Sequence, residues 1–388
     1  MTKFSLLFVA CFGCIGVCAQ QAPQVPPISV GAEQTKQYLP LLKHKKVALV
    51  VNNTAQVGNE HLLDYLLAQK VDVVKIFSPE HGFRGDADAG EKVESTKDAK
   101  TGLPIVSLYG DNKKIKKEQL EQVDVIVFDI QDVGARFFTY LSTLHYVMEA
   151  CAENKKKLVL LDRPNPNGDY VDGPVLEKGF TSFVGMHPIP IVHGMTLGEL
   201  ATLINAEKWL KDSLACDLAV SKCKNYTHST PYAPPIKPSP NLPNKQAIRL
   251  YPSVCLFEGT VVSVARGTDT PFQMIGIPDS NGTGFSFTPK SIPGMAKKPL
   301  YENKTCFGKD LRQVEPKAEV DLSYLIEMYA SYPFKEKFFN SFFNKLAGNA
   351  TLQQQIKDGK TEDEIRRSWQ VQLDLFKDKR KKYLLYSE

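Results

Sequence analysis

The strongest constraint on the fold of this chain is a repeated alternation of apolar runs and amphipathic segments through its first half. Apolar runs rich in β-branched residues predict buried strands at residues 46–51, 71–77, 104–109, 123–130, 158–161 and 189–192. Between them, leucine spacing and amphipathic periodicity predict helices at residues 61–70, 113–122, 135–154 and 197–210, the last capped by Thr196. This order favours an α/β fold with a Rossmann-like, doubly wound and mostly parallel sheet.

The alternation stops after residue 215. Residues 224–244 contain six prolines, so they can form neither a helix nor a central strand. Short β-like runs follow at 260–264 and 274–277, and helical segments follow at 321–329 and 362–382. We therefore expect a Rossmann-like catalytic domain at residues 41–215 and a smaller α+β domain at residues 216–388 that completes a cleft.

The N-terminus has the pattern of an export signal. Lys3 precedes an apolar stretch at residues 4–17, and Ala19 supplies the small residue that a signal peptidase requires. We interpret residues 1–19 as a secretory signal peptide, too short to span a membrane, and expect a periplasmic protein. The alternative is a lipid anchor on one of the three cysteines in this stretch. Residues 20–40 are expected to be a disordered or extended lead.

Composition argues against several classes of function. The net charge of +5 is small for 388 residues and the lysines are scattered, so no nucleic-acid partner is expected. No G-x-G-x-x-G follows the first predicted strand, so we expect no dinucleotide and no other cofactor. Five cysteines remain after the signal, without zinc spacing. Of these, Cys216 and Cys223 flank one predicted strand and could form a disulfide.

A polar, glycine-bearing loop follows the predicted strand at residues 71–77. It contains Glu80, His81 and Arg84 among glycines that allow a sharp turn. Loops at the carboxyl ends of parallel strands build the ligand crevice of an open α/β sheet, so this loop is our first candidate for a functional site. The structural alternative is a surface turn with a local Glu–Arg pair.

Further polar clusters follow other predicted strands. The added candidates are Asp129, Asp132, Arg136, Asp162 and His193, together with Arg266 and Thr268 in a glycine-bearing loop of the second domain. Several of them also have a structural interpretation. Asp129 could cap a helix or pair with Arg136, and Asp162 could form an ion pair with Arg163. His193 could be a hydrogen-bonded structural imidazole, and His81 could serve only to orient Glu80.

Such a crevice suits hydrolysis by carboxyl groups. A glycosidase needs one carboxylic acid that protonates the leaving oxygen, and Glu80 is our candidate for it. The second role falls to another carboxylate, acting as base or nucleophile, or to an acetamido oxygen of the substrate itself. The arginines suit an anionic substrate, because a guanidinium grips a carboxylate bidentately.

Several longer motifs occur in order along the chain: residues 78–85 (SPEHGFRG), 128–140 (FDIQDVGARFFTY), 161–166 (LDRPNP), 193–196 (HGMT), 238–241 (PSPN), 256–260 (LFEGT) and 265–268 (ARGT). Together they resemble the exo-β-N-acetylmuramidases of the NamZ type. The resemblance implies a Rossmann-like domain with a smaller C-terminal domain, a site in the cleft between them, and a catalytic glutamate at Glu80. It also implies release of N-acetylmuramic acid from the non-reducing end of peptidoglycan fragments. Ser253 and Ala265 depart from the expected glycines, which affects loop detail only.

The hypothesis is therefore an exported, metal-independent glycoside hydrolase that acts on muramic-acid-terminated glycans. We assign catalysis to Glu80, His81, Asp129 and Asp132. We assign substrate binding to Arg84, Arg136, Asp162, His193, Arg266 and Thr268. Of the arginines, Arg266 is favoured as the residue that recognises the lactyl carboxylate of muramic acid. One alternative is a metal-dependent hydrolase with Glu80, His81, Asp129, Asp132 and Asp162 as ligands. The other is a non-catalytic cell-wall-binding protein, which the scarcity of tryptophan (2 residues) argues against.

Overall fold

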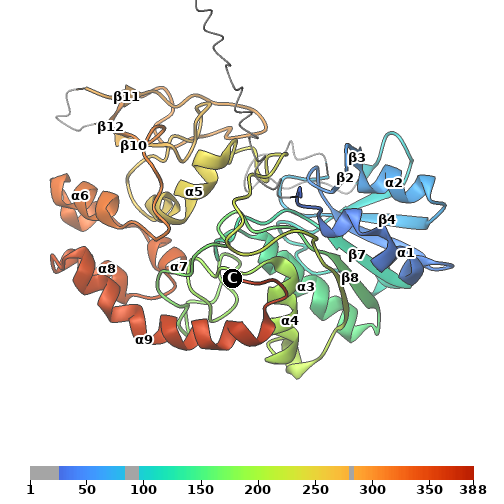
Figure 1. The fold of residues 1–388 in the computed structure, drawn as a ribbon. Helices are drawn as coiled ribbons and strands as arrows, with labels where there is room; N and C mark the ends of the chain where they lie inside the picture. The colour runs from blue at the N-terminus through green and yellow to red at the C-terminus, as the bar shows by residue number, and fades with distance from the viewer. Residues whose placement is uncertain (1–25, 84–95, 279–283) are drawn as a thin grey trace, which may run out of the picture.

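The computed structural model describes residues 26–83, 96–278 and 284–388. Its described part is built on a seven-stranded sheet with the strand order β5-β6-β4-β1-β7-β8-β9, in which only the short β5 runs antiparallel to its neighbour (Figure 1). The strands are β1 (Lys46–Val51), β4 (Asp72–Ser78), β5 (Thr96–Lys97), β6 (Pro104–Ser107), β7 (Val125–Asp129), β8 (Lys157–Leu161) and β9 (Asp217–Ser221), with a separate hairpin of β2 (Gln56–Val57) and β3 (Glu60–His61). The predicted mostly parallel α/β fold is confirmed.

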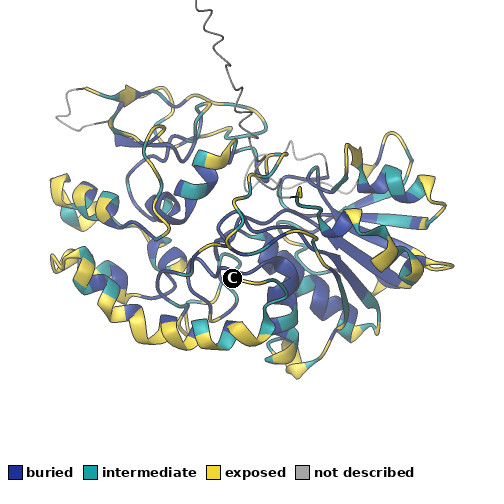
Figure 2. Cartoon of the chain, in the orientation of Figure 1, coloured by how far each residue is buried: buried dark blue, intermediate teal, exposed yellow. Residues whose placement is uncertain are grey.

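Helices cover both faces of this sheet, which makes it doubly wound. Along β1, Val47 and Leu49 face one hydrophobic cluster, while Ala48 and Val50 face another. This alternation follows from the period of two in a strand. The first cluster contains residues of α1 (Thr35–Leu42) and α2 (Leu62–Ala68); the second contains those of α3 (Tyr140–Glu153) and α4 (Leu197–Ala206). The central strands β1, β7 and β8 are almost entirely buried between the two layers and are mostly dark blue in Figure 2.

Some local predictions are corrected. Residues 189–192 form no strand, because Val192 makes only isolated bridges to Ala135 and Asp172. The lysine-rich segment contains a single 3₁₀ turn at Lys117–Leu120 in place of the predicted helix. The predicted cap of α4 is confirmed: Thr196 accepts a hydrogen bond from the Glu199 N–H, and the Glu199 side chain accepts one from the Thr196 N–H.

The central sheet extends beyond the expected domain boundary at residues 215/216. Its last strand, β9, pairs in parallel with β8, so this segment belongs to the sheet. The proline-rich connection then leads to α5 (Lys245–Val254). We call the described residues up to 244 the sheet domain and those from 245 onward the C-terminal domain.

The C-terminal domain combines a small antiparallel sheet with helices. Among the described residues its strands are β10 (Met274–Ile277), β11 (Ser286–Phe287) and β12 (Cys306–Asp310), in the order β10-β12-β11. No strand forms at the predicted 260–264, where Thr260 and Ser263 make isolated bridges. Its other elements are the 3₁₀ turns η4 (Cys255–Gly259), η5 (Lys335–Lys337) and η6 (Lys381–Tyr383), and the helices α6 (Ser323–Ser331), α7 (Phe343–Ala347), α8 (Thr351–Lys357) and α9 (Glu362–Arg380).

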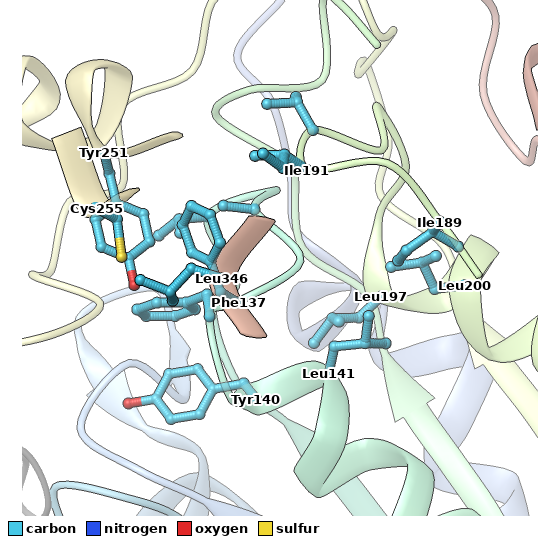
Figure 3. Packing of buried hydrophobic residues seen from close by; sticks show 14 of the residues in the cluster. Phe137, Tyr140, Leu141, Ile189, Ile191, Leu197, Leu200, Tyr251, Cys255 and Leu346 are labelled. Carbon is cyan, nitrogen blue, oxygen red and sulfur yellow. The ribbon is translucent and has the colours of Figure 1, made fainter. Parts of the chain in front are cut away.

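One continuous hydrophobic core joins the two domains. Phe137 of the sheet domain packs edge-to-face against Tyr251 of the C-terminal domain at 5.3 Å, and Leu346 lies beside them (Figure 3). Helix α9 runs back under the sheet domain to α4 (Figure 1), where Lys379 pairs with Glu207 at 2.6 Å. The relative position of the domains is therefore fixed by packing as well as by the chain connection.

The described cysteines are all free thiols, so the possible bridge between Cys216 and Cys223 is absent. These two residues sit at opposite ends of β9, whose rise of about 3.3 Å per residue holds them far beyond disulfide reach. Among the described helices, none combines the length and apolar character needed to cross a bilayer.

Candidate active site

A cavity of about 500 Å³ lies where the sheet domain meets the C-terminal domain. On the sheet-domain side, its wall comes from segments that follow β4, β6 and β7, at the carboxyl ends of parallel strands. Open α/β sheets bind their ligands at this edge. We call it the interdomain cavity; it is lined by Glu80, His81, Tyr109, Gly110, Asp111, Lys113, Phe137, Phe138, Thr139, Tyr140, Phe183, Val184, Ser239, Asn241, Leu242, Tyr251, Glu258, Arg266, Phe272 and Phe342.

Glu80 reaches the cavity because β4 ends at Ser78 and the following Pro79 has no N–H with which to continue the ladder. Its Oε2 atom accepts a hydrogen bond of 2.6 Å from Thr139 Oγ1. Tyr109 also hydrogen-bonds Glu80; burial, together with the Glu80 carboxylate, raises the pKa of the Tyr109 hydroxyl. Thr139 and Tyr109 thus orient a carboxyl group at the cavity wall.

His81 is buried and lines the same cavity. Its φ of 69° lies in the left-handed region, which is unfavourable for a residue other than glycine, and Gly82 follows with a φ of 76°. The Nε2 atom of His81 lies 3.1 Å from Ser239 Oγ. Backbone strain of this kind clusters at functional sites.

The C-terminal domain contributes an ion pair to the cavity wall. Arg266 Nε donates a hydrogen bond of 2.6 Å to Glu258 Oε1, and the guanidinium carbon lies 4.9 Å from the centre of the Phe272 ring. Although burial opposes the charged form, the Glu258 carboxylate raises the pKa of Arg266 above its usual value. The buried Nη1 atom of Arg266 has no hydrogen-bond acceptor among the described residues, so it remains a donor for a ligand.

Asp129 does not line this cavity. It is fully buried in a bidentate pair with Arg163, whose Nε and Nη2 donate hydrogen bonds of 2.5 and 2.8 Å. Burial raises the pKa of Asp129, and the positive charge of Arg163 opposes that rise. The sequence suggested Asp162 as the partner of Arg163, but the pair that forms uses Asp129, which is the end residue of β7.

Asp162 is also fully buried away from the interdomain cavity. Its carboxylate accepts hydrogen bonds from Thr196 Oγ1 (2.7 Å), the Gly198 N–H (2.8 Å) and the Tyr386 hydroxyl (2.7 Å). Burial raises its pKa to about 6, and these donors limit the rise. Asp162 therefore fastens the start of α4 and the C-terminal segment to the sheet.

Asp132 and His193 lie together in the protein interior, outside the cavity wall. Asp132 Oδ2 accepts the Gly134 N–H at 2.7 Å and lies 3.9 Å from His193 Nε2, too far for a hydrogen bond. Burial raises the pKa of Asp132 to about 7. Burial, with the positive charges of Arg380 and Arg136 nearby, lowers the pKa of His193 to about 3.

Arg136 is a structural residue. Its guanidinium is buried and donates four hydrogen bonds of 2.8 Å to backbone carbonyls, two on each domain: those of Pro174, Ile189, Leu346 and Ala347. Burial lowers its pKa to about 9. Every acceptor is a backbone carbonyl, so Arg136 is a clamp between the domains rather than a substrate contact.

Of the two remaining sequence candidates, Thr268 does not line the described cavity. Thr268 Oγ1 donates a hydrogen bond of 2.8 Å to the Ala265 carbonyl, which closes the loop that carries Arg266. Arg84 lies outside the residues that the structure describes.

Of the predicted residues, Glu80, His81 and Arg266 come together at the cavity; Asp129, Asp132, Arg136, Asp162, His193 and Thr268 do not line it. The sequence reasoning missed Tyr109, Thr139, Ser239 and Glu258 as site residues. A usable signal existed, since Tyr109 closely follows the β6 strand and the other three stand inside the motifs that carry the family resemblance.

The alternative set of metal ligands is not assembled at one place. Asp129 and Asp162 are engaged elsewhere, and only Glu80 and His81 line the cavity. Within the described ranges 26–83, 96–278 and 284–388, no three His, Cys, Asp or Glu side chains form a group suited to a metal ion.

The chain matches one known family over nearly all its length. The model of the N-terminal domain of exo-beta-N-acetylmuramidase NamZ covers residues 47–246, and that of its C-terminal domain covers residues 249–386. The chain is also 37% identical to the peptidoglycan beta-N-acetylmuramidase NamZ of Bacillus subtilis (strain 168), over 94% of this chain and 93% of that protein.

Solved structures agree with this assignment. A crystal structure of a DUF1343 family protein from Bacteroides fragilis NCTC 9343 superposes with a TM-score of 0.88 at 50% identity, over 94% of this chain and all of the other. A second DUF1343 family protein from the same organism gives a TM-score of 0.80 at 30% identity, over 93% and 100%. Together with the order of domains and the position of Glu80, these matches show that the chain belongs to the exo-beta-N-acetylmuramidase NamZ family.

Proposed function

We propose that this chain is an exo-acting glycoside hydrolase that releases N-acetylmuramic acid from the non-reducing end of peptidoglycan fragments. The observation that carries the proposal is a carboxyl group and an arginine in one cavity: Glu80 from the sheet domain and Arg266 from the C-terminal domain. The related Bacillus subtilis protein is a peptidoglycan beta-N-acetylmuramidase.

The cavity suits one terminal sugar. Its volume of about 500 Å³ is within the usual range for small-molecule sites. Aromatic side chains such as Phe137, Tyr251 and Phe342 supply apolar surface for a pyranose ring, while Asn241 and Ser239 supply polar atoms for its hydroxyl groups. Because the cavity lies between two packed domains, it would receive the end of a glycan rather than its middle.

In the proposed reaction, Glu80 gives its proton to the bridging oxygen while the bond from C1 to that oxygen breaks and its electron pair leaves with the oxygen. Thr139 and Tyr109 hold the carboxyl group in place for this transfer. Orientation of this kind accounts for a large share of enzymatic rate enhancement.

We assign the second carboxylate to Glu258, which replaces Asp129 and Asp132 in that role. Glu258 lines the cavity from the C-terminal domain, whereas Glu80 lines it from the sheet domain, and Arg266 Nε donates a hydrogen bond of 2.6 Å to Glu258 Oε1. It can take a proton from an attacking water or attack C1 itself, and the acetamido oxygen of the sugar is the third possible nucleophile. The configuration of the released sugar separates inversion from retention.

Arg266 is our candidate for the group that selects muramic acid. Muramic acid differs from glucosamine by a lactyl ether that carries a carboxylate, and Arg266 Nη1 is a buried donor without an acceptor in the described part of the chain. A buried donor that finds an acceptor only on the correct substrate discriminates strongly against a substrate that lacks it.

Export belongs to the same proposal. It rests on the basic residue, apolar stretch and small residues at the N-terminus of the sequence, which lies outside the described residues. A periplasmic protein would meet peptidoglycan fragments directly; lipid anchoring at the membrane is the alternative.

The deciding experiment incubates the protein with the disaccharide of N-acetylmuramic acid β-linked to N-acetylglucosamine. Free N-acetylmuramic acid is expected, with and without EDTA. If neither the disaccharide nor a chromogenic muramide is cleaved, the proposed function fails. Binding without turnover would instead indicate a cell-wall-binding protein, and loss of activity in EDTA that a divalent ion restores would indicate a metal-dependent hydrolase.

A further inference from the structure

A second hollow lies at the edge of the sheet opposite to the interdomain cavity. It has a volume of about 830 Å³ and is found at the amino ends of β1 and β4, where Lys46 pairs with Asp72. One part of its wall comes from residues between 35 and 45, in α1 and the turn that leads to β1. The other part comes from residues 69–72, in the turn between α2 and β4. We call it the basic hollow.

Strand β4 separates the basic hollow from the interdomain cavity. Asp72, at the start of this strand, lines the hollow, and Glu80, two residues after its end, lines the cavity. At a rise of about 3.3 Å per residue, the two ends of β4 are about 20 Å apart. Figure 1 shows α1 and β4 on the side of the sheet domain that is remote from the C-terminal domain. A partner bound at the basic hollow would therefore leave the interdomain cavity open.

The charge of the basic hollow is positive. Four exposed lysines line it: Lys36, Lys43, Lys45 and Lys70. None of them forms an ion pair or a side-chain hydrogen bond with another residue in the ranges that the structure describes. Asp72 is the single acidic residue in the described lining. By contrast, Lys157 at the same edge of the sheet pairs with Asp217 at 2.6 Å. The hollow thus has an excess of positive charge that the described part of the chain does not neutralise.

Local structure does not account for this cluster of lysines. His44 and Lys70 follow α1 and α2 closely, and each has a φ of 60°, in the left-handed region where glycine is the usual residue after a helix. A cation near the end of a helix is favoured by the helix dipole, but Lys36 is in the first turn of α1, where the dipole opposes a cation. The helix dipoles therefore explain only some of these positions.

The residue types in the lining fit a lipid surface better than a protein partner. The described lining contains no arginine, tyrosine or tryptophan, which supply most of the binding energy in protein interfaces, and lysine is depleted there. Its apolar part is aliphatic and includes Leu39, Val71 and the exposed Pro40. Lysine side chains can lay their stems along such surface while their ammonium groups meet phosphate groups, and clusters of four or more attract anionic membranes.

We propose that the basic hollow docks the protein on an anionic lipid bilayer by binding the phosphate groups of its lipids. This inference goes beyond the proposed function and does not depend on it. Docking through the amino ends of β1 and β4 would hold the protein at the membrane surface and leave the carboxyl ends of the strands, with the interdomain cavity, accessible to a substrate in solution.

The test measures co-sedimentation with vesicles of phosphatidylcholine, with and without phosphatidylglycerol. The protein is used from Gln20 onward, so that the apolar N-terminal stretch cannot itself bind lipid; every described residue is kept. The hollow variant is Lys36→Ala/Lys43→Ala/Lys45→Ala/Lys70→Ala. The control variant removes the same charge from four exposed lysines outside the hollow: Lys178→Ala/Lys208→Ala/Lys304→Ala/Lys345→Ala. Lys208 has a φ of 56°, so it also matches the backbone conformation of Lys70. Thermal unfolding of each variant shows that it is folded.

We expect wild type to bind the vesicles that contain phosphatidylglycerol and not those of phosphatidylcholine alone. Added salt should weaken this binding. Each lysine near an anionic surface contributes about fivefold to the partition coefficient, so the hollow variant should lose at least about thirtyfold. The control variant should stay within about threefold of wild type, because its lysines are scattered.

Several results would overturn the proposal. They are absence of binding to the anionic vesicles, equal binding by wild type and the hollow variant, and an equal loss in the hollow and control variants, which would show an effect of net charge alone. Calorimetric titration with glycerol phosphate and with polyglutamate tests the other sources of negative charge. If wild type binds glycerol phosphate but not vesicles, the hollow is a site for a soluble phosphate compound. If it binds polyglutamate but not vesicles, the partner is an acidic protein segment. None of these measurements uses hydrolysis, so their outcome is independent of the proposed function.

Discussion

Thr139 Oγ1 lies 2.6 Å from Glu80 Oε2, across the end of β4 and the start of α3. Thr139 is the N-terminal cap residue of this 14-residue helix, but its hydroxyl bonds Glu80 rather than a backbone N–H of the helix. The carboxyl group is thus tied to the helix end that carries positive partial charge. The hydrogen bond to the helix end therefore holds the carboxyl group in one orientation.

Replacement of this carboxyl group tests its role. Glu80→Gln keeps the shape of the side chain and can still bond Thr139, but an amide cannot donate and recover a proton. We expect kcat to fall by about 10²–10⁴-fold, the usual contribution of general acid catalysis, with little change in thermal stability or in substrate binding. A variant within about threefold of wild type would remove Glu80 from the catalytic role.

Glu258→Gln separates catalysis from positioning. If Glu258 is the second catalytic carboxylate, the variant should lose at least about 10²-fold in kcat, on muramides and on any glucosaminide substrate alike. If Glu258 only orients Arg266, the variant should instead raise KM for muramides, leave kcat near that of wild type and leave glucosaminides unaffected. Steady-state kinetics on both substrates distinguish these results.

The interdomain clamp predicts a change in stability without a change in chemistry. Arg136→Met keeps the bulk of the side chain but leaves four buried carbonyls without their donor. We expect the free energy of unfolding to fall by about 3–5 kcal/mol in urea titrations. Lys309→Met, which breaks the exposed pair with Glu327, is the control and should cost at most about 1 kcal/mol. If the Arg136→Met variant is nearly inactive but as stable as wild type, Arg136 contacts the substrate and the structural role assigned here is wrong.

The first half of the fold could be predicted because each strand and helix there has its own sequence period. Residues 47–51 are apolar at every position, which predicts a strand buried on both faces, and the structure packs a hydrophobic cluster against each face. Residues 189–192 are apolar, which predicts another buried strand. The segment is indeed buried, but it is irregular and makes only isolated bridges. Periodicity does not tell a buried strand from a buried loop.

The site could be predicted only in part, because the same residue types serve structure and chemistry. Asp129 ends one apolar strand and Glu80 follows another, so the two look alike in the sequence. In the structure, Asp129 pairs with Arg163, which is 34 residues away, whereas Glu80 lines the cavity. Arg136 finds two of its four acceptors about 210 residues later. Such partners are set by tertiary packing and leave no local signal. Neutral residues such as Thr139 and Ser239 form no charged cluster in the sequence, so they give no sign of a site there.

Asp132 gives the protein a pH-dependent stability that a variant can isolate. Burial raises its pKa to about 7, whereas an unfolded aspartate titrates near 3.9. Between these values the folded state binds more protons than the unfolded state, so this group makes the protein less stable as pH rises. Asp132→Asn removes that penalty, and the stability of the variant relative to wild type should increase by up to about 4 kcal/mol from pH 4 to pH 8.

Urea titrations of both proteins at several pH values measure this difference in the free energy of unfolding. A difference that stays constant or falls as pH rises would contradict the expectation. His193 is present in both proteins, so its own titration largely cancels.

Discrimination between muramic acid and glucosamine is the sharpest test of Arg266. Its Nε is held by Glu258, while its buried Nη1 has no acceptor among the described residues, so the guanidinium is fixed in advance for one further carboxylate. Arg266→Ala should cost roughly 2–4 kcal/mol in kcat/KM towards muramides, as when one partner of a buried charge pair is truncated. Hydrolysis of glucosaminides should fall by less, because they offer no carboxylate and lose only the support that Arg266 gives to Glu258.

Arg266→Lys is the matched control for this prediction. Lysine keeps the charge but cannot bond Glu258 through Nε and a substrate carboxylate through Nη1 in one planar fork, so it should recover only part of the lost discrimination. If the alanine variant loses both substrates equally, Arg266 supports its loop through Glu258 and does not read the lactyl group. The role could not then pass to Arg136, because four backbone carbonyls already occupy its guanidinium. Arg84 would be the arginine of the original set left to test, by the same pair of substitutions and the same two substrates.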